Sequence, residues 1–218
     1  MRPLILAFSQ WTDPVFQGVV LRALGLSALV FVGLFAGAVW GLGQWTPGPF
    51  WAGWLAGAVG GILAGLIALW LFVPAAVLIG TLYVERIAAA VERRFYPSLP
   101  HAAGAPVSQQ GWDGVVLGLQ LIPLQLLTLL LTIIVPGLGL IIGLLITGWA
   151  IGRGLFVAVA MRRMGRAEAL LAYRSNRAGA LLPGVALAAL GLVPFANLLV
   201  PVMGTAAMVH VLQDGRRL

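Results

Sequence analysis

Apolar residues follow one another along this chain in long runs, and charged residues fall in short islands between the runs. Positions 23–84, 114–152 and 178–213 hold no charged residue. About 20 apolar residues are enough to cross the hydrocarbon core of a bilayer as an α-helix. Each run also has a neutral turn sequence near its middle: Thr46-Pro47-Gly48-Pro49, Pro136-Gly137-Leu138-Gly139 and Pro194-Phe195-Ala196-Asn197. The pattern therefore predicts three helical hairpins.

Composition identifies the solvent of these hairpins as lipid. Hydrophobic residues make up 61% of the chain and charged residues only 9%, which leaves too little polar surface for a soluble domain. The net charge is +7, and the 13 residues that carry positive charge are all arginines, with no lysine. Because the arginines flank apolar runs, the positive-inside rule and anionic headgroups explain them better than nucleic acid does. We expect a multi-pass protein of the bacterial inner membrane, with both termini cytoplasmic and no nucleic-acid partner.

The expected fold class is an all-α integral membrane protein. It has two long transmembrane helices, two re-entrant or hemi-penetrating hairpins, and short amphipathic helices at the interface. The last hairpin has arms of about 14 and 15 residues, which reach only ~21 to 23 Å and fall short of a ~30 Å core. The whole chain is one expected membrane domain, 1–218. Its segments are 18–44 (first span), 50–95 (second span with a cytoplasmic extension), 114–160 (hairpin), 162–177 (amphipathic arginine-rich helix) and 180–212 (re-entrant hairpin).

Five arginines share about a third of the circumference of the predicted 162–177 helix. They are Arg162, Arg163, Arg166, Arg174 and Arg177. One interpretation is a stripe that binds lipid headgroups and controls topology. The other is a surface at a pore mouth that concentrates anions.

Arg153 interrupts an otherwise apolar arm. An arginine in such a place is a functional hypothesis by default, although its side chain could extend to the cytoplasmic interface instead. Gly148, Gly152 and Gly154 surround it and would allow a helix or an anion to approach closely.

Enzyme signatures are absent from the sequence. The chain has no cysteine, its two histidines are far apart, and its six acidic residues are scattered among the charged islands. No spacing typical of metal ligands occurs, so we expect no catalytic residues, metal or cofactor. The lack of acidic residues inside the runs favours passive movement over proton-driven transport.

The C-terminal half resembles the CysZ family of bacterial sulfate permeases, which is grouped with the etoposide-induced membrane protein family. The resemblance lies in the order and spacing of four segments: 134–139, 174–177, 193–201 and 204–208. It implies two full spans, two hairpins that only partly penetrate the membrane, and homo-oligomers. The hairpin tips correspond to Pro136, Gly137, Pro194, Asn197 and Pro201.

The segment that enters the first span differs from the family pattern. CysZ proteins have a Pro-Gly-Leu-Arg sequence associated with sulfate, whereas this chain has neutral residues at 14–18. The candidate anion-binding residues here are Gln17, Gly18, Arg22 and Arg153. Two functions remain open: an oligomeric, passive permease or channel for a small inorganic anion, for which the resemblance suggests sulfate, and a non-transporting membrane scaffold or lipid-organising envelope protein.

Overall fold

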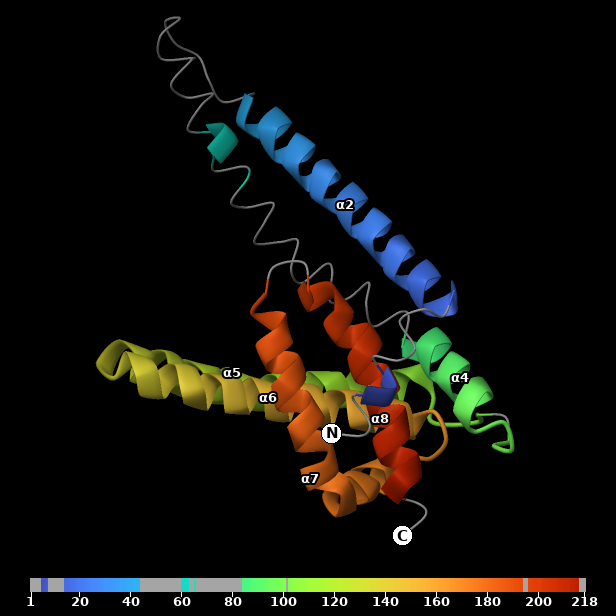
Figure 1. Cartoon of the computed structure of the whole chain (residues 1–218). Coiled ribbons are helices and arrows are strands. Elements are labelled where there is room, and N and C mark those ends of the chain that lie inside the picture. Colours follow the sequence, from blue (N-terminus) through green and yellow to red (C-terminus); the bar gives the residue numbers. More distant parts are fainter. Residues whose placement is uncertain are drawn as a thin grey trace, which may run out of the picture. The chain divides into compact units, whose positions relative to one another are not determined.

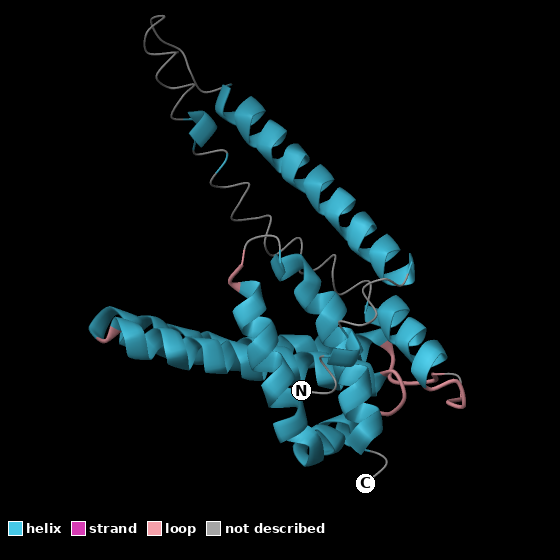
Figure 2. Ribbon diagram, in the orientation of Figure 1, coloured by secondary structure: helices cyan, strands magenta, loops and turns pink. Residues whose placement is uncertain are grey.

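The structure is a computed structural model of the chain. It describes residues 5–7, 14–43, 60–62, 65, 84–100, 102–193 and 196–215. Regular structure within these ranges is entirely helical (Figure 2), which confirms the all-α prediction. The chain divides into two compact units, residues 1–18 with 83–218 and residues 19–82.

Helix α2, Pro14–Gly43, supplies most of the described part of the second unit. It covers nearly all of the first span expected at 18–44. Leu29 and Trp40 are exposed on it, as suits a helix whose solvent is lipid. The predicted tip at 46–49 and most of the second span up to residue 83 lie outside the described residues.

In the first unit, α5 (Val107–Ile134) and α6 (Pro136–Met161) form a tight antiparallel hairpin (Figure 1). Only Val135 separates them, and its N–H donates to the Leu131 carbonyl at 2.7 Å. Pro136 begins α6, where a missing N–H is harmless. A methyl group on Gly139 would overlap Thr132 of the facing helix. The turn therefore depends on a proline at one position and a glycine at another.

Both helices of this hairpin, Ser108–Ile134 and Gly137–Met161, are long and apolar enough to cross a membrane by length and composition. Large apolar side chains project from them into the surroundings, among them Leu119, Leu126, Ile133, Leu140 and Ile141. Exposed apolar surface on this scale is stable only in lipid or against another protein surface. The chain is a membrane protein.

Helix α7, Arg166–Gly191, corrects the expected boundary between the arginine-rich segment and the last hairpin. The sequence predicted separate elements at 162–177 and 180–212, whereas one helix continues from the arginine-rich segment into the first arm of the hairpin. Gly179 stands at the expected boundary, but a glycine inside a helix costs only about 1 kcal/mol relative to alanine. Ala180 and Gly184, which follow it, pack closely against α6 and offset that cost. Arg162 and Arg163 lie in the turn before α7 rather than on it.

Small residues allow α7 to cross α6 with the two backbones in contact. A methyl group on Gly184 would overlap the carbonyl oxygen of Gly148, and one on Gly152 would overlap the carbonyl oxygen of Ala180. Figure 1 shows α7 lying across the α5–α6 hairpin. Two of the three glycines around Arg153 therefore accept a helix of the same chain. The third, Gly154, faces Leu117.

The next described helix after α7 is the short 3-10 helix η1 (Ala196–Leu199), which leads directly into α8 (Val200–Gly215). Almost every residue of α8 is buried, and Met203, Met208 and Leu212 are among the largest fully buried side chains. Helix α8 packs against α4 (Val84–Phe95), α6 and α7. It is the core of the first unit.

His210 of α8 lies inside this core. Its side chain is fully buried, and Nδ1 lies 2.9 Å from the Tyr96 hydroxyl. The Phe95 ring packs edge-on against the imidazole with centroids 5.0 Å apart. The histidine thus joins α8 to the end of α4.

Candidate functional site

A buried carboxylate binds two arginines where α5, α6 and α7 meet. Both guanidinium Nη atoms of Arg153 donate to the Asp113 carboxylate at 3.2 Å. Arg166 donates to the same carboxylate through Nε at 3.1 Å, and its Nη2 lies 3.0 Å from Oδ1. Asp113 and Arg153 are almost completely buried. We call these three residues the Asp113 cluster, and their formal charges leave an excess of one positive charge.

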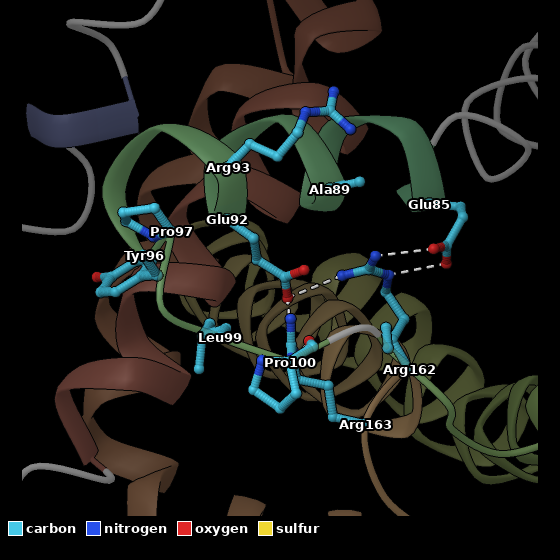
Figure 3. Close-up of a pocket in the computed structure, with 11 residues that line it drawn as sticks. Glu85, Ala89, Glu92, Arg93, Tyr96, Pro97, Leu99, Pro100, Arg162 and Arg163 are labelled. Atoms are coloured by element: carbon cyan, nitrogen blue, oxygen red, sulfur yellow. Dashed lines mark hydrogen bonds and ion pairs between the residues drawn. The ribbon is translucent and has the colours of Figure 1, made fainter.

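A second group of ion pairs ties α4 to the end of α6 (Figure 3). Arg162 makes a bidentate pair with Glu85, with hydrogen bonds of 2.8 and 2.7 Å, and its Nη1 lies 2.9 Å from Glu92 Oε1. Arg163 donates to the same Glu92 oxygen at 2.8 Å and to the Pro100 carbonyl at 2.9 Å. We call Glu85, Glu92, Arg162 and Arg163 the Glu92 cluster. It fixes α4 and the loop after it against α6.

The two glutamates of this cluster have very different surroundings. The side chain of Glu92 is 8% exposed and that of Glu85 is 64% exposed, whereas Arg162 is 3% exposed. Burial raises the pKa of Glu92, but the guanidinium groups of Arg163 and Arg162 lower it by a larger amount. The pKa of Glu92 therefore lies below its ordinary value. Burial lowers the pKa of Arg162, and the two carboxylates more than restore it. Glu92 and Arg162 are therefore charged at neutral pH.

Beside the Glu92 cluster is an open pocket of about 320 Å³. Its walls come from α4, from the loop that follows α4, and from the two arginines after α6 (Figure 3). Arg93 lines the pocket as well. Because the arginines and glutamates around the pocket are largely paired with one another, the pocket adds little free charge to the protein.

The ion pairs change the interpretation of the five-arginine stripe. Arg162 and Arg163 are engaged with Glu92 and buried, and Arg166 is engaged with Asp113. The stripe prediction placed all five arginines on one helix, but α7 begins only at Arg166. Arg174 and Arg177 remain as exposed arginines of α7, and neither has an acidic partner among the described residues.

The other candidate residues are dispersed. Gln17 is exposed and Gly18 half-buried near the start of α2, and Arg22 is exposed on the part of α2 that belongs to the second unit. Arg153 is therefore the candidate anion-binding residue that the structure builds into a charged cluster.

Among the hairpin-tip candidates, Pro136 and Gly137 stand at the start of α6. Asn197 lies in η1 and Pro201 in the first turn of α8. Pro194 lies outside the described residues.

Sequence reasoning missed the carboxylates Asp113, Glu85 and Glu92 as partners of the arginines. A signal for the first of them was present. Asp113 and Arg153 bound the uncharged run 114–152, and folding a run into a hairpin brings its two ends together. The last charge before such a run and the first charge after it are thus expected neighbours.

Comparison with known proteins identifies the family of this membrane protein. Neither a search of curated proteins nor a search of solved structures finds a match. A family model described as "Sulfate transporter CysZ/Etoposide-induced protein 2.4" matches residues 4–201, which is most of the chain. This match confirms the resemblance found in the C-terminal half of the sequence, and it extends to the N-terminal residues as well. The chain belongs to the sulfate transporter CysZ/etoposide-induced protein 2.4 family.

Proposed function

We propose that this protein is a passive permease or channel for a small inorganic anion, with sulfate as the first substrate to test. It works as a homo-oligomer in the bacterial inner membrane, with its arginine-rich ends and both termini in the cytosol. The family description supports sulfate transport as the class of function. The observation that carries the proposal is the excess positive charge of the Asp113 cluster, at the base of a hairpin apolar enough to cross a membrane.

The chemistry of the Asp113 cluster suits an anion. Each guanidinium group presents several N–H donors, which pair well with the oxygens of a tetrahedral oxyanion. A single carboxylate cannot satisfy ten such donors, so donor capacity remains after Asp113 is bound. In a poorly hydrated site, uncompensated positive charge attracts anions over a longer distance than it would in water.

Orientation follows from the same charges. Arginine is enriched on the cytoplasmic side of membrane proteins, and both the Asp113 cluster and the Glu92 cluster lie at the ends of apolar helices. We therefore assign these ends to the cytoplasmic face. An anion that enters from outside would meet the Asp113 cluster near the end of its path.

Flux into liposomes tests the proposal. Purified protein is reconstituted, and uptake of radiolabelled sulfate, chloride and phosphate is measured against empty liposomes. We expect uptake of at least one anion to exceed the background and to be reduced at least tenfold by Arg153→Gln. The matched control is Arg93→Gln, which removes the same charge from an exposed position on α4 and should leave uptake unchanged. Uptake equal to that of empty liposomes for all three anions would refute transport.

A second function has its own supporting observation. The exposed Arg174 and Arg177 are available to lipid headgroups, which favours a non-transporting, lipid-organising scaffold. Replacing these two arginines with glutamine separates the hypotheses, because Arg162, Arg163 and Arg166 have structural ion pairs that must stay intact. Normal anion flux together with lost lipid binding would show that the arginines serve the lipid and that transport is separate. Absent flux in the wild type together with arginine-dependent lipid binding would favour the scaffold.

A further inference from the structure

An apolar groove lies where α7 crosses the α5–α6 hairpin. Its volume is about 420 Å³, and its walls carry no polar surface. The lining residues come from all three helices: Leu124 of α5, Leu145, Ile146 and Trp149 of α6, and Leu181 of α7. A groove with this lining offers nothing to an inorganic ion. Its chemistry matches a hydrocarbon chain.

Polar groups gather near Leu181 and Trp149. Trp149 lines the groove, and Tyr173 lies on α7 one turn before Arg177. Arg177 is one turn before Leu181 on the same helix. Arg174 lies one further turn along α7 and is exposed. Tryptophan, tyrosine and arginine together are typical of the boundary between acyl chains and headgroups.

We propose that the groove and these two arginines form a binding site for one anionic glycerophospholipid. One acyl chain occupies the groove beside Ile146, and the phosphate and the rest of the headgroup pair with Arg177 and Arg174. Charge complementarity selects the occupant. The two guanidinium groups have no acidic partner among the described side chains, and a phosphodiester next to an acyl chain would provide one at the required place.

This site is distinct from the Asp113 cluster. Arg153 and Arg166 are held by Asp113, while Arg174 and Arg177 lie further along α7. The lipid would fill the angle between α7 and the hairpin and so fix the crossing of the two elements. The inference does not depend on anion transport, and it holds equally if the protein moves no solute.

Native mass spectrometry of the detergent-solubilised protein tests the inference, with added dioleoylphosphatidylglycerol or dioleoylphosphatidylcholine as probes. We expect the wild type to bind one phosphatidylglycerol per protomer in preference to phosphatidylcholine. An arginine close to an anionic lipid surface contributes about a fivefold factor in affinity. Arg174→Gln with Arg177→Gln should therefore lower the affinity for phosphatidylglycerol about 25-fold. Leu181→Trp, which fills the groove, should weaken binding of both lipids.

Arg93→Gln is the matched control, since it removes an exposed arginine far from the groove in sequence. It should retain the wild-type lipid preference. Inorganic phosphate at the same concentration should not displace phosphatidylglycerol, because it cannot occupy the groove. Equal binding of the two lipids by the wild type would overturn the inference. So would an unchanged lipid preference in the double arginine variant, or an equal loss in the control.

Discussion

Removing the negative charge of Glu92 tests how α4 is held to the rest of the first unit. In the Glu92→Gln variant, the two arginines of the cluster face a neutral amide in a site where the carboxylate was 8% exposed. Removing one partner of a buried ion pair costs about 3–5 kcal/mol. Arg162 keeps its bidentate pair with Glu85, and Arg163 keeps the Pro100 carbonyl. We therefore expect the free energy of opening α4 to fall by about 2–4 kcal/mol. This is the contribution of one or two hydrogen bonds to charged groups.

Glu85→Gln is the matched control, because it makes the same chemical change on the same helix and against the same Arg162. The Glu85 side chain is 64% exposed, and an exposed ion pair contributes about 0–1 kcal/mol. The contrast between the two variants depends on the burial of the carboxylate and on whether it faces two arginines or one. It does not depend on the number of hydrogen bonds, since Glu85 accepts two good ones.

Hydrogen exchange of the α4 amides, followed by mass spectrometry of peptides covering 84–100, measures the effect where it arises. A loss of 2 kcal/mol or more raises the exchange rate of opening-limited amides about 30-fold or more. Glu85→Gln should raise it no more than about fivefold. If Glu85→Gln accelerates exchange as much as Glu92→Gln does, burial does not decide the strength of these pairs, and the reasoning fails.

Three further predictions concern pH, the Asp113 cluster and the helix crossing. Because the folded-state pKa of Glu92 lies below its ordinary value of 4.5, its stabilising effect is complete above that value and is lost as the pH falls through the folded pKa. The protection of α4 against exchange should fall on acidification below about pH 4.5, and less steeply in Glu92→Gln than in the wild type. Asp113→Asn leaves two arginines without a counter-ion and should lower the free energy of unfolding by about 3–5 kcal/mol, measured by reversible unfolding in SDS. Arg153→Gln leaves the pair between Asp113 and Arg166 intact and should lower it by less. The reverse order would contradict the assigned geometry. Gly184→Ala should destabilise the folded protein by about 1–3 kcal/mol, because the added methyl group overlaps the backbone of α6. In Gly118→Ala the added methyl group meets nothing within 4 Å, so this variant should be neutral or stabilise the protein by up to about 1 kcal/mol. Equal effects of the two variants would show that α6 and α7 do not cross closely.

The sequence was most informative where a long periodic run decides the structure. The uncharged run 114–152, with a Pro-Gly turn inside it, corresponds to α5 and α6. Such a run has few ways to hide its backbone from lipid except as helices. The family was also recognisable from the order of short segments. Both inferences rest on properties that accumulate over many residues.

Local details were less accessible because they depend on contacts between distant segments. The arginine stripe assumed that the helix begins at Arg162, but α7 begins four residues later. Helical periodicity assigns faces correctly only within a helix, so arginines in the preceding turn point elsewhere. The burial of His210 could not be predicted from the sequence either, because it depends on contacts with Tyr96 and Phe95, more than 100 positions earlier.

The backbone contact between α6 and α7 has an evolutionary consequence. At Gly148, Gly152 and Gly184 every possible substitution adds atoms, so mutation can only push the two helices apart and never fill a gap. Elsewhere in a core, a harmful change can be compensated by a smaller or larger neighbour. Here the neighbouring atoms are largely main chain, which no mutation can trim. We therefore expect this crossing to be the part of the fold where divergence between relatives is most restricted.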